Sequence, residues 1–261
     1  MSVAAQHTVR PDLRQTRTVN TVSSGQPPDI SGPSGSNAAA PLTAPALRRA
    51  LIAGAHRVIA ARDGLNKINV FPVADGDTGN NLAFTLGSVL NGALSRRSRH
   101  IGELLKRIGD DAIDGARGNS GAILAQHARA QPALDAQTLA AAVRHGANSA
   151  RSALAHPVEG TIISVIDSFA DAMEESAAQL RDDPRGGFHQ ALAQARRALA
   201  HTPQQMALLQ RAGVVDAGAQ GFVDLLEGIG EFVEGGPRAM RLRANVRAAN
   251  EGGEYGDGDD R

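Results

Sequence analysis

The sequence has no cysteine, no tryptophan and one tyrosine among its 261 residues. Without cysteine there is no disulfide, no thiolate metal ligand and no thiol nucleophile. Aromatic residues make up only 3% of the chain, so stacking surfaces for nucleic-acid bases are scarce. The formal net charge is zero, and no global charge draws the protein to nucleic acid or to an anionic membrane. We therefore expect no nucleic-acid partner.

Lysine is also rare, and its positions exclude one common nucleotide site. Lys67 follows Asn66 and Lys106 follows Leu105, so the G-K-[ST] end of a Walker phosphate loop is absent. An H-E-x-x-H zinc motif is absent as well. A nucleotide site in this chain must be of another kind.

No apolar run approaches the roughly 20 residues that cross a bilayer, and we expect a cytoplasmic protein without a membrane span. The hydrophobic share of 42% can fill one sizeable core. Residues 1–40 are rich in Ser, Thr, Pro and Gly, a composition that predicts a disordered tail. We expect one domain over residues 41–236, followed by a flexible tail or linker over residues 237–261.

The apolar residues recur with a helical period almost throughout the domain. Strong stripes cover residues 47–59, 82–90, 101–112 and 162–173, and weaker ones cover 122–130, 136–154, 187–200 and 218–234. Only residues 68–73 and 213–215 have a strand-like composition, and Pro72 makes the first a poor sheet member. The sequence therefore predicts an all-α bundle or barrel of about eight helices.

The first polar loop, NKINVFPVADGDTGNN at residues 66–81, has features of a metal and phosphate site. Asp75 and Asp77 flank Gly76, so in a turn both carboxylates can face one side and suit a hard cation. The chain then enters a helix, whose free N–H groups and dipole favour phosphate. The residues at this entrance are Thr78, Gly79, Asn80 and Asn81.

Two alternatives apply to the same loop. Asp, Gly, Thr and Asn are good residues for starting a helix, so the segment can be a capped turn and nothing more. An EF-hand calcium loop is excluded, because its sixth and twelfth positions hold Asn80 and Leu86 in place of Gly and Glu. The metal and capping interpretations both stay open at this point.

Three further loops lie at predicted helix entrances. The second, DGARGNSG at residues 114–121, offers backbone amides and a hydroxyl to a phosphate, or simply caps the next helix. The third, GVVDAGAQGF at residues 213–222, can cover a nucleotide or turn the chain into the last helix. In residues 157–161 we favour a cap formed by Glu159 and Thr161. The candidates in the second and third loops are Gly118, Asn119, Ser120, Gly121, Asp216 and Gly218.

The stretches NVFPVADGDTGNN, GARGNSGAIL, PVEGTIISV and VVDAGAQGF, in this order, resemble the ATP-binding L domain (DhaL) of dihydroxyacetone (glycerone) kinases. They resemble its relative in bacterial fatty acid kinases more closely, over about residues 42–236. The resemblance implies an eight-helix antiparallel barrel whose loops at one end bind ATP through two Mg²⁺ ions. Ala74 and Asn80 depart from the usual Pro and Thr.

The resemblance also implies roles for individual residues. Asp75 and Asp77 match the metal carboxylates, and Asn69 matches a further metal ligand of the fatty-acid-kinase type. The phosphate-binding positions match Thr78, Asn81, Ser120 and Gly121, and the loop over the nucleotide matches Asp216 and Gly218.

Phosphoryl transfer depends on alignment and charge neutralisation, and we assign Arg117 to the charge of the transition state. We find no general base, which favours a carboxylate acceptor that is already ionised. We expect a kinase for a fatty acid presented by a DegV-type carrier protein. The alternatives are the ATP subunit of a dihydroxyacetone kinase, acting with a dihydroxyacetone-binding subunit, and a nucleotide-binding module without turnover. A homodimer is left open.

Overall fold

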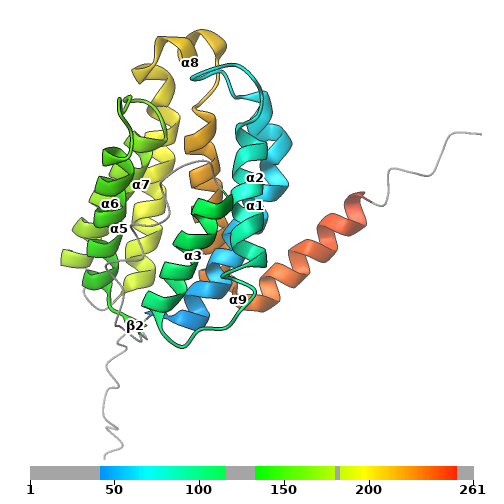
Figure 1. The fold of residues 1–261 in the computed structure, drawn as a ribbon, viewed down its shortest axis with the longest axis vertical. Helices are drawn as coiled ribbons and strands as arrows, with labels where there is room; N and C mark the ends of the chain where they lie inside the picture. Colours follow the sequence, from blue (N-terminus) through cyan, green and yellow to red (C-terminus); the bar gives the residue numbers. More distant parts are fainter. Residues whose placement is uncertain (1–41, 116–132, 180–182, 252–261) are drawn as a thin grey trace, which may run out of the picture. The chain divides into compact units, whose positions relative to one another are not determined.

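The computed structural model describes residues 42–115, 133–179 and 183–251, all within one unit of the chain, Asn37–Arg261 (Figure 1). These residues form eight helices, and the all-α fold class is confirmed. The helices are α1 (Ala44–Lys67), α2 (Thr78–Asn91), α3 (Ile101–Gly115), α5 (Ala136–Ser152), α6 (Ile162–Gln179), α7 (Pro184–Gln205), α8 (Ala207–Ala212) and α9 (Ala217–Glu251). Within the described residues, no helix is both long and apolar enough to cross a membrane.

Two very short strands, β1 (Leu42–Thr43) and β2 (Ala133–Leu134), pair antiparallel with Leu42 opposite Leu134. They join the chain just before α1 to the chain just before α5. Residues 68–73 and 213–215, which have a strand-like composition, are loops. Two-residue strands leave no periodic signal, so the sequence could not indicate them.

The helices pack in the spatial order α3, α2, α1, α9, α7, α6 and α5. One group of buried side chains lies among α5, α6, α7 and α9, where Phe169 makes edge-to-face contacts with Phe188 and Phe222. A second group joins α1, α2 and α3 around Leu94 and Leu104. Edge-to-face aromatic pairs and buried aliphatic side chains are strong contributors to a core of this kind.

Glycines allow α1 and α9 to approach each other closely. A Cβ atom on Gly228 would lie 2.7 Å from the Cα atom of Gly54, and one on Gly54 would lie 2.5 Å from the carbonyl oxygen of Leu225. Both separations are shorter than nonbonded atoms tolerate. The α1–α9 contact therefore depends on the absence of side chains at these two positions.

Helix α7 continues through Pro203 to Gln205, although proline cannot donate the helical hydrogen bond to Leu199. The hydroxyl of Thr202 donates to that carbonyl oxygen at 2.8 Å. Thr202 is fully buried, and its hydroxyl also accepts from the backbone N–H of Asp216 at 3.2 Å. The same side chain therefore supports the end of α7 and holds the start of α9 beside it.

Helix α9 is interrupted at Gly236, where φ is +59° and ψ is −167°. Glycine adopts this conformation without steric cost, and Pro237 is well suited to start a new helical segment. The backbone then stays helical as far as Glu251. Gly236 is the last residue of the expected domain, and the expected boundary and the flexible tail beyond it stay predictions.

Three of the loops that were singled out in the sequence, those at residues 66–81, 157–161 and 213–222, gather at one end of the helices (Figure 1). The α1–α2 loop, the α5–α6 loop, α8 and the start of α9 lie at this end, and β2 lies at the other. Because neighbouring helices are antiparallel, their alternate connections meet at the same end. We call it the loop end below.

Candidate functional site

The α1–α2 loop is fixed by Asn66, in the last turn of α1. Its side-chain oxygen accepts from the backbone N–H of Asn80 at 3.2 Å, and its Nδ2 donates to Asn80 Oδ1 at 3.2 Å. A Cβ atom on Gly79 would collide with the carbonyl oxygen of Arg62 and lie 2.7 Å from Asn66 Oδ1. The start of α2 is therefore seated directly against the end of α1, and only glycine fits at position 79.

Within this loop, Asn69 and Asp75 form a direct polar pair. Asn69 Nδ2 donates to Asp75 Oδ1 at 2.7 Å. Asn69 is only 5% exposed, and its Oδ1 atom is buried without a hydrogen-bond partner among the described residues. A buried oxygen without a donor is costly, so it points to a ligand that would complete the site.

Asp77 occupies the N-cap position of α2 but makes no capping hydrogen bond through its side chain. The capping interpretation of the loop therefore does not account for this carboxylate, because Asn66 satisfies the Asn80 amide instead. Two carboxylates and an amide oxygen, from Asp75, Asp77 and Asn69, are hard oxygen donors of the kind that Mg²⁺ prefers. The residues present fit the metal that the resemblance implies.

The first turn of α2 supplies backbone donors beside these oxygens. The N–H of Asn81 donates to the carbonyl oxygen of Asp77 at 2.9 Å and that of Asn80 to Asn66. The N–H groups of Thr78 and Gly79 have no hydrogen-bond partner in the ranges that the structure describes. Free N–H groups at a helix start, together with the helix dipole, favour an anion.

Asp216, in the third loop, is a helix cap. Its Oδ1 atom accepts from the N–H of Ala219 at 2.8 Å at the start of α9. Burial raises the pKa of this carboxyl group above its ordinary value, and hydrogen bonds from the backbone N–H groups of Ala219 and Ile162 oppose that rise only in part. Asp216 therefore ties α9 to the start of α6, and contact with a nucleotide stays a prediction.

In the α5–α6 loop, where we favoured a cap, neither Glu159 nor Thr161 accepts a hydrogen bond from a backbone N–H of α6 among the described residues. Glu159 accepts hydrogen bonds from the hydroxyl of Ser164 at 2.5 Å and from Arg151 at 2.9 Å. These two bonds, the one from Ser164 first, lower the pKa of Glu159. Thr161 is buried and donates to the carbonyl oxygen of Val158 at 2.7 Å. Both side chains are thus occupied by local bonds.

Contacts between neighbouring elements connect the α1–α2 loop with the start of α9. A Cβ atom on Gly221 of α9 would clash with Leu82 of α2 and lie 3.6 Å from Leu65 of α1. One on Gly218 would lie 3.5 Å from Cβ of Ile162, in α6. The predicted residues of the first and third loops are therefore positioned by helices that touch one another.

The remaining predicted site residues lie outside the described residues. They are Arg117, Gly118, Asn119, Ser120 and Gly121. Their assignment to phosphate and to transition-state charge therefore stays a prediction.

Two residues that position the site were missed in the sequence. Asn66 forms a hydrogen bond with Asn80, 14 residues further along the chain, and no local sequence pattern indicates such a contact. Thr202 precedes Pro203 inside α7, and a hydroxyl residue directly before a helical proline is a signal that can be sought.

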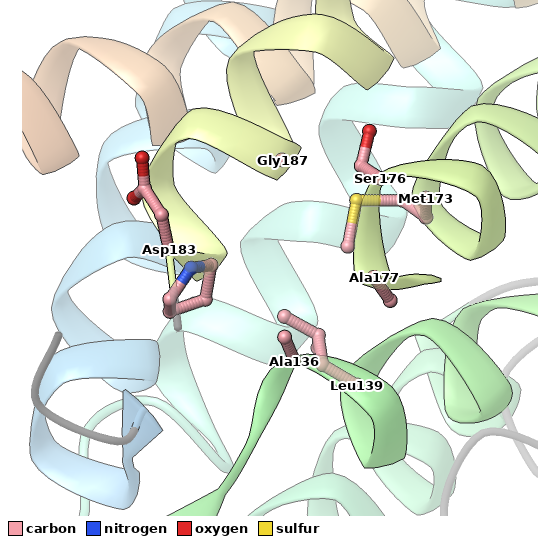
Figure 2. A pocket seen from close by; sticks show the side chains of 8 residues that line it. Ala136, Leu139, Met173, Ser176, Ala177, Asp183 and Gly187 are labelled. Atoms are coloured by element: carbon pink, nitrogen blue, oxygen red, sulfur yellow. The ribbon is translucent and has the colours of Figure 1, made fainter. Parts of the chain in front are cut away.

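A shallow hollow elsewhere, between α5, α6 and α7, contains none of the predicted residues (Figure 2). Its polar side chains already have partners: the Ser176 hydroxyl donates to Gln190 at 3.0 Å, and Asp183 accepts from the N–H of Gly186 at 2.9 Å. The remaining lining is mostly apolar, including Leu139 and Met173. Both polar side chains that line the described part of the hollow are already hydrogen-bonded, so the α1–α2 loop remains the candidate site.

Comparison with known proteins agrees with this picture. The DAK2 domain family matches residues 72–231. An uncharacterized protein of Staphylococcus haemolyticus is 36% identical over 185 residues, which cover 68% of this chain and 33% of the relative. One of Staphylococcus aureus is 34% identical over 192 residues, which cover 71% of this chain and 35% of the relative. The chain thus spans about a third of the length of these curated relatives.

Among solved structures, the chain is similar to the dihydroxyacetone kinase of C. freundii, crystallised in complex with AMP-PNP and Mg²⁺. The TM-score is 0.54 at 18% identity, and the match covers 83% of this chain and 38% of the kinase chain. This likeness establishes a shared fold. Together with the match over residues 72–231, the confirmed all-α fold and the order of the sequence motifs show that the chain belongs to the DAK2 domain family.

Proposed function

We propose that this chain is a Mg-ATP-dependent phosphotransferase domain that acts at the loop end. The observation that carries the proposal is the buried Oδ1 atom of Asn69, which has no partner among the described residues and lies beside the carboxylate of Asp75. Asp75, Asp77 and Asn69 would hold the metal, and the free N–H groups at the start of α2 would face the phosphates. Mg²⁺, when bound, neutralises charge on the phosphate oxygens.

The protein's own residues would bind and align the nucleotide. Asn66 and Gly79 fix the start of α2 against α1, so the N–H groups of Thr78 and Gly79 are held in place before a ligand arrives. Hydrogen-bond donors that are already in position do not have to rearrange during the reaction. In the second loop, Arg117 and the backbone of residues 118–121 are proposed to complete the phosphate site.

For the acceptor, we favour the carboxylate of a fatty acid presented by a DegV-type carrier protein. Residues 68–77 contain no histidine, lysine or tyrosine that could act as a base. A carboxylate is already ionised near neutral pH and needs none. A second candidate, the ATP subunit of a dihydroxyacetone kinase, is favoured by the fold that the chain shares with that enzyme.

Exposed apolar side chains on elements that meet at the loop end support a protein partner. In the described part of the chain, large exposed apolar residues occur in the α1–α2 loop, in α2, between α5 and α6, and in α8. They are Val73, Phe84, Leu154, Val158 and Leu208. The elements that carry them meet at the loop end (Figure 1). Exposed apolar surface next to a transfer site suits a carrier that must bring its acceptor within reach of the phosphate.

An assay of ADP formation with the full chain tests this function. The chain is mixed with Mg-ATP and, in separate arms, with a DegV-type carrier loaded with fatty acid, with the empty carrier, or with a dihydroxyacetone-binding subunit and dihydroxyacetone. We expect ADP only in the arm with the loaded carrier. Turnover of dihydroxyacetone would select the second candidate, and nucleotide binding without turnover in any arm would indicate a non-catalytic module.

A further inference from the structure

Three exposed arginines lie close together in the loop between α2 and α3. Arg96, Arg97 and Arg99 have neither an ion pair nor a hydrogen bond to any residue that the structure describes. Most other described arginines have bonds: Arg144, for example, pairs with Asp171 and Glu174. Outside this loop and up to residue 236, where side chains are described, two arginines lack such a bond, Arg185 and Arg211, and they lie far apart in the sequence. Residues 95–100, called the arginine loop below, thus concentrate unpaired positive charge.

The arginine loop is firmly attached to the bundle. Leu94 before it and Ile101 after it are buried in the core formed by α1, α2 and α3. Ser98, in its middle, is also buried, and its hydroxyl lies 2.9 Å from a carboxylate oxygen of Glu103. Arg48 of α1 donates to the carbonyl oxygen of Ser95 at 3.4 Å. The three arginines therefore project from a fixed segment between buried anchors.

The sequence on either side of the loop adds positive charge, and the acidic side chains near it come from α3: Glu103 and the half-buried Asp111, which lies against Gly92. Residues 44–62 and residues 78–102 contain no acidic residue. Arg49, in the same turn of α1 as Arg48, is exposed as well. The first acidic residue after the loop, Glu103, already pairs with Arg107 at 3.2 Å. A chain with zero formal net charge thus presents a local basic surface, which can attract anions at short range.

We propose that the arginine loop is a docking site for the anionic headgroups of a bilayer surface. Protein interfaces usually have an apolar or aromatic centre, whereas the exposed large apolar residues of the described chain lie in other elements. Arginines without apolar neighbours suit the uniform negative charge of anionic lipids. We choose lipid headgroups over other anions because the proposed function has a fatty-acid acceptor, and this choice rests on that proposal. The basic surface itself is observed independently of the proposed function.

Such docking would leave the loop end free. The arginine loop begins at Ser95, shortly after α2 ends at Asn91, and the candidate metal site precedes the start of α2. A helix of 14 residues is about 20 Å long at 1.5 Å per residue. The chain could therefore rest on a membrane while its nucleotide site stays open to a carrier protein.

Co-sedimentation of the full chain with lipid vesicles tests the proposal. The vesicles consist of phosphatidylcholine alone or of phosphatidylcholine with phosphatidylglycerol. The test variant R96Q/R97Q/R99Q is compared with R185Q/R197Q/R211Q, which removes the same charge from exposed arginines elsewhere. The helical content of both variants is checked by circular dichroism.

We expect the parent chain to bind the anionic vesicles and not the neutral ones. The binding should weaken as salt is added. The test variant should bind about a hundredfold more weakly, because each basic residue at such a surface contributes roughly a fivefold effect. The control variant should stay near the parent. Equal binding to both vesicle types, equal losses in both variants, or binding to an oligonucleotide in preference to vesicles would each overturn the proposal.

The readout is independent of the proposed kinase function. Vesicle binding is measured without nucleotide, and a D75N/D77N variant should bind vesicles like the parent. Conversely, R96Q/R97Q/R99Q should bind Mg-nucleotide in solution like the parent. Failure of membrane docking would therefore leave the phosphotransferase proposal untouched, and the reverse also holds.

Discussion

Asn69 donates a 2.7 Å hydrogen bond to Asp75, while its own side-chain oxygen is buried and receives no donor from the part of the chain that the structure describes. The Asp75 carboxylate thus orients the side-chain amide of Asn69, and the Oδ1 atom of that amide is left for a ligand. Side chains that bind a metal or orient one of its ligands typically change the metal affinity by about 10- to 100-fold when removed.

Replacing Asn69 should therefore weaken metal-dependent nucleotide binding. We expect Asn69→Ala to raise the Mg²⁺ concentration needed for half-maximal AMP-PNP binding by about 10- to 100-fold. Asn69→Asp, whose side chain has two oxygens, should raise the required Mg²⁺ concentration by a smaller factor. Calorimetric titration at several Mg²⁺ concentrations measures both. An unchanged Mg²⁺ requirement in Asn69→Ala would show that the buried oxygen does not serve the metal.

Thr202 offers a test of how α7 passes through Pro203. Thr202→Val removes the donor to the Leu199 carbonyl oxygen and the acceptor for the Asp216 N–H, leaving buried polar groups unpaired. We expect a loss of about 1–3 kcal/mol in the free energy of unfolding, measured by urea denaturation. Thr202→Ser keeps the hydroxyl and serves as the control. Equal stability of the two variants would contradict this role.

The burial of the Asp216 carboxyl group leads us to predict a specific dependence of stability on pH. Its pKa is raised in the folded protein, chiefly by burial, so the folded state binds its proton more tightly than the unfolded state does. The free energy of unfolding contributed by this group therefore falls as pH rises from the ordinary carboxyl value toward the raised one, and is constant above it.

Asp216→Asn keeps an oxygen that can cap α9 but removes this titration. The stability of the variant relative to the parent should thus increase between about pH 4 and about pH 7. Asp216→Ala, which loses the cap, should cost about 1 kcal/mol more than Asp216→Asn. Urea denaturation at both pH values measures the difference. A difference between Asp216→Asn and parent that does not change with pH would exclude the burial effect.

Gly79 tests the close seating of α2 on α1. A Cβ atom there would collide with the Arg62 carbonyl oxygen, and backbone at this position cannot move without displacing Asn66. Gly79→Ala should destabilise the protein by about 1–3 kcal/mol. Gly87→Ala, in the same helix with no atom within 4 Å of the added Cβ, should instead stabilise it by roughly 0.5–1 kcal/mol. Thermal denaturation of both variants measures the two changes in stability. A change of the same sign in both variants would contradict the close contact at Gly79.

The sequence predicted the fold well where apolar residues recur periodically. The stripes over residues 101–112 and 162–173 correspond to α3 and α6, because helical burial requires that spacing. The predicted helix over 187–200 was too short, since the Thr202 hydroxyl replaces the bond that Pro203 cannot make. The family resemblance is confirmed by the match over residues 72–231.

The candidate site was only partly predictable. Asp75 and Asp77 were found because two acids around a glycine form a local pattern. Asn69 came only from the family resemblance, since its burial and its bond to Asp75 depend on the folded loop. Asn66 could not be found locally, because its partner Asn80 is 14 residues away. Asp216, which we assigned to the nucleotide loop, also has a capping role that its position before α9 could have indicated.

The most direct test of the central claim is calorimetric titration of AMP-PNP into the D75N/D77N variant in the presence of Mg²⁺. Neither carboxylate caps a helix through its side chain, so helical content and thermal midpoint should match those of the parent. The account predicts that the parent binds the nucleotide only with Mg²⁺ and that the variant gives no measurable binding. Binding by the variant as tight as that of the parent would contradict the assignment of these two residues to the metal.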